Sequence, residues 1–255
     1  MNLRETRKLE ASAVGAIHGG DVETLRRLLR EVPGLARARI GDPEACRPGA
    51  MSRTLLHVAT DWPGHFPNVA ETIGVLIEAG ADPNARFTGP HTETPLHWAA
   101  SSDDVDALDA LLDAGADLEA PGAVIGGGTP LSDAVAFGQW KAARRLVERG
   151  ARTSLWEAAA LGMLDRVEGH FAPRPGSSAA DEGAGPTPEE ITQAFWCACH
   201  GGERSTAEYL LDRGADVNWI GYDELTPLDA ASRSGADALV EWLRSQGAKS
   251  ARELG

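Results

Sequence analysis

The strongest constraint on the fold is a short motif that recurs along most of the chain. In its fullest form it occupies residues 94–100 and reads Thr-Pro-Leu-His-Trp-Ala-Ala, and related stretches begin at Thr54, Thr129 and Thr226. A second element, Gly-Ala-Asp at 115–117, returns in similar form behind the other copies. A motif that returns at intervals of roughly 20–50 residues is typical of proteins built from stacked copies of one supersecondary unit. The chain is therefore predicted to be a repeat protein.

These residues resemble the ankyrin repeat, whose signature is Thr-Pro-Leu-His-x-Ala within a unit of about 33 residues. The resemblance extends from about Ala11 to Ala248. It implies an all-α solenoid in which each unit is a helix-turn-helix and short β-hairpins connect the units. Because each unit buries its apolar face on its neighbours, we expect one ankyrin-repeat domain over residues 1–255.

Aligning the units on the motif threonine predicts about seven of them. They start near Ala11, Thr54, Thr94, Thr129, Thr153, Gln193 and Thr226. Only 24 residues separate Thr129 from Thr153, which predicts a missing hairpin between the fourth and fifth units. Residues 61–68 lengthen the turn of the second unit and carry aromatic side chains, and residues 172–188, rich in Pro, Gly, Ser and Ala, predict a flexible linker.

Charge and composition exclude several classes of partner. The chain has 38 acidic and 24 basic residues and a formal net charge of -14, so nucleic acid and anionic membranes are not expected to bind it. No segment approaches the ~20 apolar residues of a membrane span, which predicts a cytoplasmic protein. Three cysteines, Cys46, Cys197 and Cys199, predict neither a disulfide framework nor a zinc site. No motif for a cofactor is found, and no cofactor is expected.

Seven tryptophans are many for such an array, and three stand at related positions. Trp156 and Trp196 lie three residues after their anchors, where the motif has its histidine, and Trp98 lies four after. One interpretation is that these rings fill space between helices that carry small residues. The other is that they wall a pocket on the concave side of the array, beside the missing hairpin.

Several titratable side chains are candidates for a site. The resemblance implies that His97 ties its helix to the hairpin backbone, and a catalytic role for it would need a carboxylate nearby. Asp133 and Glu157 lie four residues after their anchors, where two acids could raise each other's pKa and act as acid and base. Alternatively they form hydrogen bonds to neighbouring units. The spacing of His91, Glu93 and His97 matches no zinc signature, so no metal site is predicted.

Two functions from different classes follow. The first is an interaction module that binds a protein partner along the concave face and the hairpin tips, and the negative charge favours a basic partner. The second is a small-molecule-binding protein or an acid/base enzyme of the isomerase, dehydratase or cyclase type, with an apolar substrate and with Asp133, Glu157 and His97 as catalytic candidates. The oligomeric state is not fixed by the sequence. The candidate binding residues are Asp61, Trp62, His91, Glu93, Trp98, Phe137, Trp156, Trp196, Trp219 and Tyr222.

Overall fold

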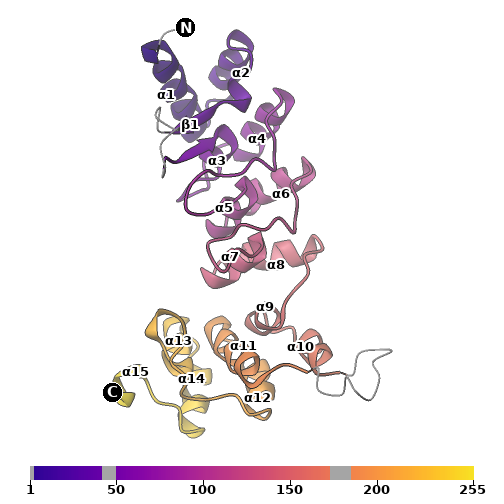
Figure 1. Cartoon of the computed structure of the whole chain (residues 1–255), viewed down its shortest axis with the longest axis vertical. Coiled ribbons are helices and arrows are strands. Elements are labelled where there is room, and N and C mark those ends of the chain that lie inside the picture. Colours follow the sequence, from indigo (N-terminus) through magenta and orange to yellow (C-terminus); the bar gives the residue numbers. More distant parts are fainter. Residues whose placement is uncertain (1–2, 42–49, 173–184) are drawn as a thin grey trace. The chain divides into compact units, whose positions relative to one another are not determined.

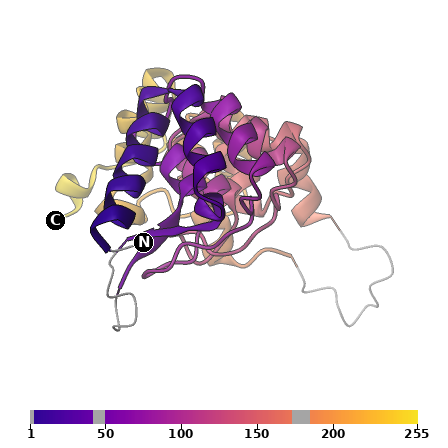
Figure 2. The ribbon, with the colours of Figure 1, turned by 90° about the horizontal axis from the view of Figure 1, so that it is seen from above.

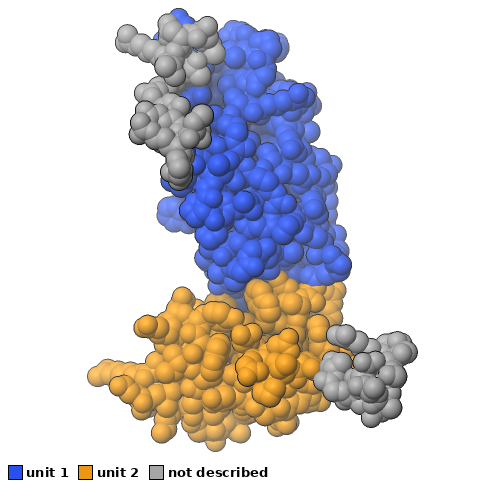
Figure 3. Space-filling view, in the orientation of Figure 1, with its two compact units in different colours: residues 1–152 blue, residues 153–255 orange. Residues whose placement is uncertain are grey.

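The computed structural model describes residues 3–41, 50–172 and 185–255. The chain divides into two compact units, residues 1–152 (unit 1) and 153–255 (unit 2), coloured separately in Figure 3. The described residues contain seven consecutive helix pairs, four in unit 1 and three in unit 2. The predicted all-α architecture of repeated helix-turn-helix units is confirmed. Cys46 and most of the segment predicted as a linker lie outside the described residues.

Unit 1 alternates a first and a second helix in each pair. The elements are α1 (Leu3–Gly19), α2 (Val22–Glu31), the 3-10 helix η1 (Leu35–Arg37), β1 (Arg39–Gly41), β2 (Ser52–Thr54), α3 (Leu55–Ala59), α4 (Val69–Glu78), α5 (Pro95–Ser101), α6 (Val105–Asp113), α7 (Pro130–Ala136) and α8 (Trp140–Glu148). The first helices α1, α3, α5 and α7 form one row and the second helices α2, α4, α6 and α8 form another (Figure 1). Seen from above, the strands and the connecting loops of unit 1 gather along one side of the helices (Figure 2).

The recurring motif explains why each first helix begins where it does. Thr54, Thr94 and Thr129 are N-caps with extended backbone, and each forms a capping box with the third residue of its helix. Pro95 and Pro130 stand at the first helical position, where the missing N–H would have no helical partner. The threonine and the proline of the motif therefore set the start of the helix.

The apolar positions of the motif form the core of unit 1. Leu96 and Leu131 are completely buried, and so are the small residues Ala99, Ala100 and Ala134 that let neighbouring helices approach closely. Leu108 and Leu146 of the second helices are buried in the same way. Each repeat of unit 1 is consequently held by the repeats on either side of it.

The connections between the pairs of unit 1 are short hairpins that hydrogen-bond to one another. Strand β1 pairs antiparallel with β2, with Ile40 opposite Arg53. Ser52 also pairs with Thr88 of the next connection, and the guanidinium of Arg39 donates to Ser52 and Thr88. The hairpins are therefore joined in a row along one edge of the helices.

The long turn at residues 61–68 spans three helix pairs. His65 donates its backbone N–H to Asp104 at 2.6 Å, and the side-chain amide of Asn68 donates to the carbonyl of Gly20 at 3.0 Å. Phe66 stacks on His18 with ring centres 4.4 Å apart. Because both flanking turns hold it, this segment is fixed on the edge of unit 1 opposite the hairpins.

Unit 2 continues the pattern with altered helix starts. Its elements are α9 (Leu155–Ala160), α10 (Leu164–Phe171), α11 (Pro188–Gly201), α12 (Arg204–Leu211), η3 (Tyr222–Glu224), α13 (Pro227–Arg233), α14 (Asp237–Ser245) and α15 (Ala251–Leu254). Helix α9 begins one residue later than the motif register predicts, because Ser154 rather than Thr153 is its N-cap. The N-cap of helix α11 is Thr187, six residues before the predicted anchor Gln193, and it forms a capping box with Glu190.

A side chain from one repeat repeatedly holds the start of the next connection. Asn84 accepts the N–H of Asp117 at 2.7 Å, and Asn218 accepts the N–H of Lys249 at 2.8 Å. In front of α11 no such asparagine is available, and the hydroxyl of Thr192 accepts the N–H of Asp216 at 3.1 Å instead. The extended helix α11 thus takes over a task that a hairpin residue performs elsewhere.

Candidate functional site

The first candidate surface consists of four exposed apolar side chains in unit 1. Trp62 is 81% exposed, Phe137 is 48% exposed, and Val124 and Ile125 are each 38% exposed. Trp62 and Phe137 follow the ends of first helices α3 and α7, whereas Val124 and Ile125 lie at the tip of the hairpin that precedes α7. We call these four residues the unit 1 apolar surface. They flank the row of first helices on both sides, at positions that the repeat framework does not use for its core.

A cluster of aromatic rings joins helices α3 and α5 of unit 1 and the connection between them. The indole of Trp98 packs edge-on against His57, with ring centres 4.9 Å apart, and lies 5.4 Å from Phe87. The guanidinium of Arg53 lies 6.0 Å from the centre of the Trp98 ring and also pairs with Asp61. Trp98 is half-buried in this cluster.

Two acids of unit 1 are buried near one another. Burial raises the pKa of Asp133, which is completely buried, to about 7; the N–H of Ile125, 3.4 Å away, opposes the shift and the nearby Glu93 carboxyl adds to it. Within the described residues, Oδ2 of Asp133 has no hydrogen-bond partner. Burial also raises the pKa of Glu93, and the hydrogen bond from Trp98 opposes that shift. Asp133 therefore holds the tip of the hairpin from inside.

The histidines of the motif are fully engaged by the backbone. In His97, Nδ1 accepts the N–H of Thr94 at 3.1 Å, and Nε2 lies 3.4 Å from the carbonyl oxygen of Gly128. His57 makes the same contacts with Thr54 and with the carbonyl of Glu93. Burial lowers the pKa of both rings to about 4, so both are neutral at pH 7. Each ring joins a first helix to the hairpin that follows it.

In unit 2, Trp196 does what the histidines do in unit 1. Its indole N–H donates to the carbonyl of Leu225 at 2.8 Å, directly before the next motif threonine, and the ring is buried. Glu157 is buried at the start of α9, where its carboxylate accepts from the backbone N–H and the hydroxyl of Ser154 at 2.8 and 2.7 Å. Trp156 beside it is half-buried. Trp156 packs against the core of unit 2, and the ring of Trp196 contacts His200 and Tyr222 of the same unit.

The predicted tryptophan-lined pocket draws on residues of both units. Trp98, His97 and Asp133 belong to unit 1, whereas Trp156, Glu157 and Trp196 belong to unit 2. That pocket stays a prediction. His91, the remaining candidate of unit 1, is exposed on the connection that leads to α5.

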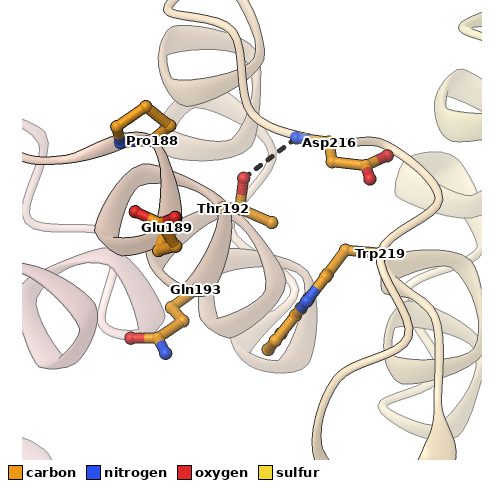
Figure 4. A pocket seen from close by; sticks show the side chains of 6 residues that line it. All are labelled: Pro188, Glu189, Thr192, Gln193, Asp216 and Trp219. Carbon is orange, nitrogen blue, oxygen red and sulfur yellow. Dashed lines mark hydrogen bonds between the residues drawn. The ribbon is translucent and has the colours of Figure 1, made fainter.

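A second candidate surface is a cleft of about 270 Å³ in unit 2. One wall is the first two turns of α11 and the other is the segment that carries Trp219, as Figure 4 shows. The ring of Trp219 makes an edge contact with Tyr222, which in turn makes an edge contact with Trp196. The residues that line the cleft are Pro188, Glu189, Thr192, Gln193, Asp216 and Trp219.

Sequence reasoning named some of these residues and missed others. Trp62, Phe137, Trp219 and Tyr222 were predicted, whereas Val124, Ile125 and the α11 side of the cleft were not. The signal for the hairpin tip is the apolar pair directly before three glycines at 126–128. The signal for the cleft is Thr187-Pro188 followed by two glutamates, a helix start inside the segment predicted as a linker.

The structure and the sequence give no sign of a metal site or a membrane span in the part of the chain that is described. Among residues 3–41, 50–172 and 185–255, no three His, Cys, Asp or Glu side chains are grouped so that they could hold a metal ion. No helix in the same ranges has the length and apolar character needed to cross a membrane. Cys197 and Cys199 are buried thiols whose pKa values burial raises, so they are unreactive at neutral pH.

Comparison with known proteins supports the class that the paired helices define. Residues 68–155 match the family model for ankyrin repeats (3 copies). An ankyrin repeat and KH domain-containing protein of Caenorhabditis briggsae is 30% identical over 197 residues, which cover 72% of this chain and 7% of that protein. The ankyrin repeat and KH domain-containing protein mask-1 of Caenorhabditis elegans is 40% identical over 50 residues, 20% of this chain and 2% of that protein.

The chain therefore contains ankyrin repeats, at residues 68–155, and ankyrin repeats are in general protein-interaction modules. It spans less than a tenth of the length of the relatives that it matches.

Proposed function

We propose that this chain is a protein-interaction module whose partner contacts the unit 1 apolar surface. The observation that carries the proposal is the exposure of Trp62, Val124, Ile125 and Phe137 at positions outside the core. Single exposed apolar residues are common on protein surfaces, but large aromatic side chains in particular dominate the energy of interfaces. Here they flank one row of helices on both sides, which is the arrangement that a partner lying along the row would contact.

The rigidity of the segments that carry these residues supports the proposal. Trp62 belongs to a turn that is hydrogen-bonded to both neighbouring turns, and the hairpin tip at Val124 and Ile125 is held by Asp133. A backbone segment that is already fixed does not have to be ordered on binding, which lowers the entropy cost of association. The net charge of -14 favours a basic partner, because opposite charge speeds encounter and disfavours acidic competitors.

The proposal is tested with a library of short random peptides displayed on phage and selected on the immobilised chain. We expect enriched peptides that combine basic and apolar residues. Their binding should fall at least about tenfold, the effect of losing one well-packed anchor, in Trp62→Ala and Ile125→Ala. The matched control is Leu254→Ala, which removes an equally exposed apolar side chain from α15. Selection of no peptide, or equal loss in the control, would overturn the proposal.

A second candidate function is a small-molecule site at Asp133. One observation favours it: a carboxyl with a pKa of about 7 and a free oxygen in a buried position suits proton transfer. The same burial means that a substrate reaches it only when the hairpin at 121–128 opens. Native mass spectrometry of the purified protein tests this candidate. A small molecule that travels with the protein and is absent from Asp133→Asn supports it, and a mass equal to the bare chain contradicts it.

A further inference from the structure

We infer that the cleft of unit 2 is a subsite for one arginine side chain of the protein partner. This inference rests on the proposed function only because it assigns the arginine to a protein partner. The cleft's volume of about 270 Å³ lies below the ~300–1,000 Å³ of pockets that enclose whole small ligands. It has room for a single long side chain. The cleft is also open to solvent, as a side chain that enters from a partner requires.

The tryptophan ring of the cleft is held in place from behind. Gly221 packs against the benzene part of the Trp219 ring so closely that a Cβ at residue 221 would overlap it. Tyr222 fixes the ring from the side, with ring centres 6.0 Å apart and planes at 86°. Figure 4 shows the ring across the cleft from Thr192 and Gln193. A flat aromatic face that cannot turn away is a platform for a cation, and a planar guanidinium stacks on it best.

The charges around the cleft favour a cation. Glu189 lies on the α11 wall and Asp216 at the rim, and none of the six lining residues is basic. In the described residues, neither carboxylate takes part in an ion pair. The start of α11 carries the partial positive charge of a helix N-terminus, but Glu189 and Glu190 both lie in its first turn and outweigh it. A guanidinium on Trp219 would therefore enter a cleft whose charged lining residues are both acids.

The origin of the cleft lies in the sequence. Helices α5 and α13 begin at the motif threonine, and an asparagine in the connection before each of them holds the connection that follows the repeat. Helix α11 begins six residues early, so Thr192 makes this contact from the helix itself, and residues 188–193 become a wall. The cleft consequently depends on the early start of helix α11.

The test uses acetyl-arginine-amide as the probe and the whole chain, with binding followed at the Trp219 indole N–H by NMR. We expect a saturable shift of that signal and a much smaller one with acetyl-citrulline-amide, which has the same shape without the charge. Glu189→Gln should weaken binding about threefold, as expected for one exposed ion pair. Glu241→Gln removes one exposed acid from α14 instead and should leave the affinity unchanged.

A second variant separates the role of the ring from that of the charges. Gly221→Ala leaves every charge in place but pushes the Trp219 ring out of position, so arginine binding should be lost while the helical circular dichroism is retained. Equal binding of the citrulline probe, equal binding of acetyl-lysine-amide, or no shift of Trp219 would each overturn the inference. If the arginine probe does not bind but peptide selection on unit 1 succeeds, the arginine subsite is excluded and the proposed function is not. The reverse outcome removes the proposed function and leaves a guanidinium site.

Discussion

Replacing Asp133 by asparagine should remove much of the sensitivity of unit 1 to rising pH. The carboxyl has a pKa of about 7 in the folded protein, against an ordinary value near 4 in the unfolded chain. The folded state therefore holds the proton more tightly. The stability that this contributes is fully present below about pH 4 and is lost as the pH rises through 7. A difference of about three units corresponds to about 4 kcal/mol, an upper limit because local relaxation lets water reach the ionised carboxylate.

Urea unfolding followed by circular dichroism measures this effect at pH values from 4 to 8. The free energy of unfolding of Asp133→Asn minus that of the wild type should rise with pH by more than about 1 kcal/mol and by at most about 4. Taking the difference cancels the contributions of His57 and His97, which both proteins share. Asp106→Asn, an exposed aspartate of α6, is the control and should show no such trend. A difference that stays flat across this range would refute the assignment of a buried, protonated Asp133.

Other substitutions test the packing and the repeat contacts. Leu131→Ala should cost about 2–5 kcal/mol of unfolding free energy, because this completely buried side chain leaves a cavity; a loss below about 1 kcal/mol in urea unfolding would contradict its place in the core. Trp196→Phe should cost about 1–3 kcal/mol, because the carbonyl of Leu225 loses its donor, and thermal melting at the wild-type temperature would show that this bond is dispensable. Because burial lowers the pKa of His57 and His97 to about 4, the free energy of unfolding of the wild type minus that of a double glutamine variant should fall as the pH drops from about 6.5 through 4, and a difference that stays flat would exclude both rings as the cause.

The motif residues made most of the fold predictable. Three consecutive motif residues have three different roles: Thr94 caps the helix, Pro95 occupies its first turn and Leu96 is buried in the core. Recurrence of the motif therefore predicts both where each helix starts and that it packs on the neighbouring repeats. Trp196 shows that a different residue at the histidine position of the motif can make the same contact. Its indole N–H reaches the carbonyl directly before the next motif threonine, which the histidine ring reaches in unit 1. Local hydrogen bonding of this kind is determined by residues close in sequence or one repeat apart.

The parts that escaped prediction depend on how much space surrounds a side chain. Trp98 and Asp133 occupy the same position of the motif, yet the tryptophan is half-buried and the acid is completely buried, because the hairpin at 121–128 folds over Asp133. No spacing rule distinguishes the two. The start of α11 was hidden for a different reason, since the composition of the segment around Thr187 outweighed a short capping signal.

The most direct test of the interaction proposal is a hydrogen–deuterium exchange footprint of the whole chain with and without a peptide from the display selection. The proposal predicts slower exchange on peptide binding at residues 61–68, at the hairpin 121–128 and at the turn after α7 around Phe137. It also predicts unchanged exchange in the second helices α4, α6 and α8, which lie in the other row. Protection confined to those second helices, or the same protection in Ile125→Ala as in the wild type, would contradict it.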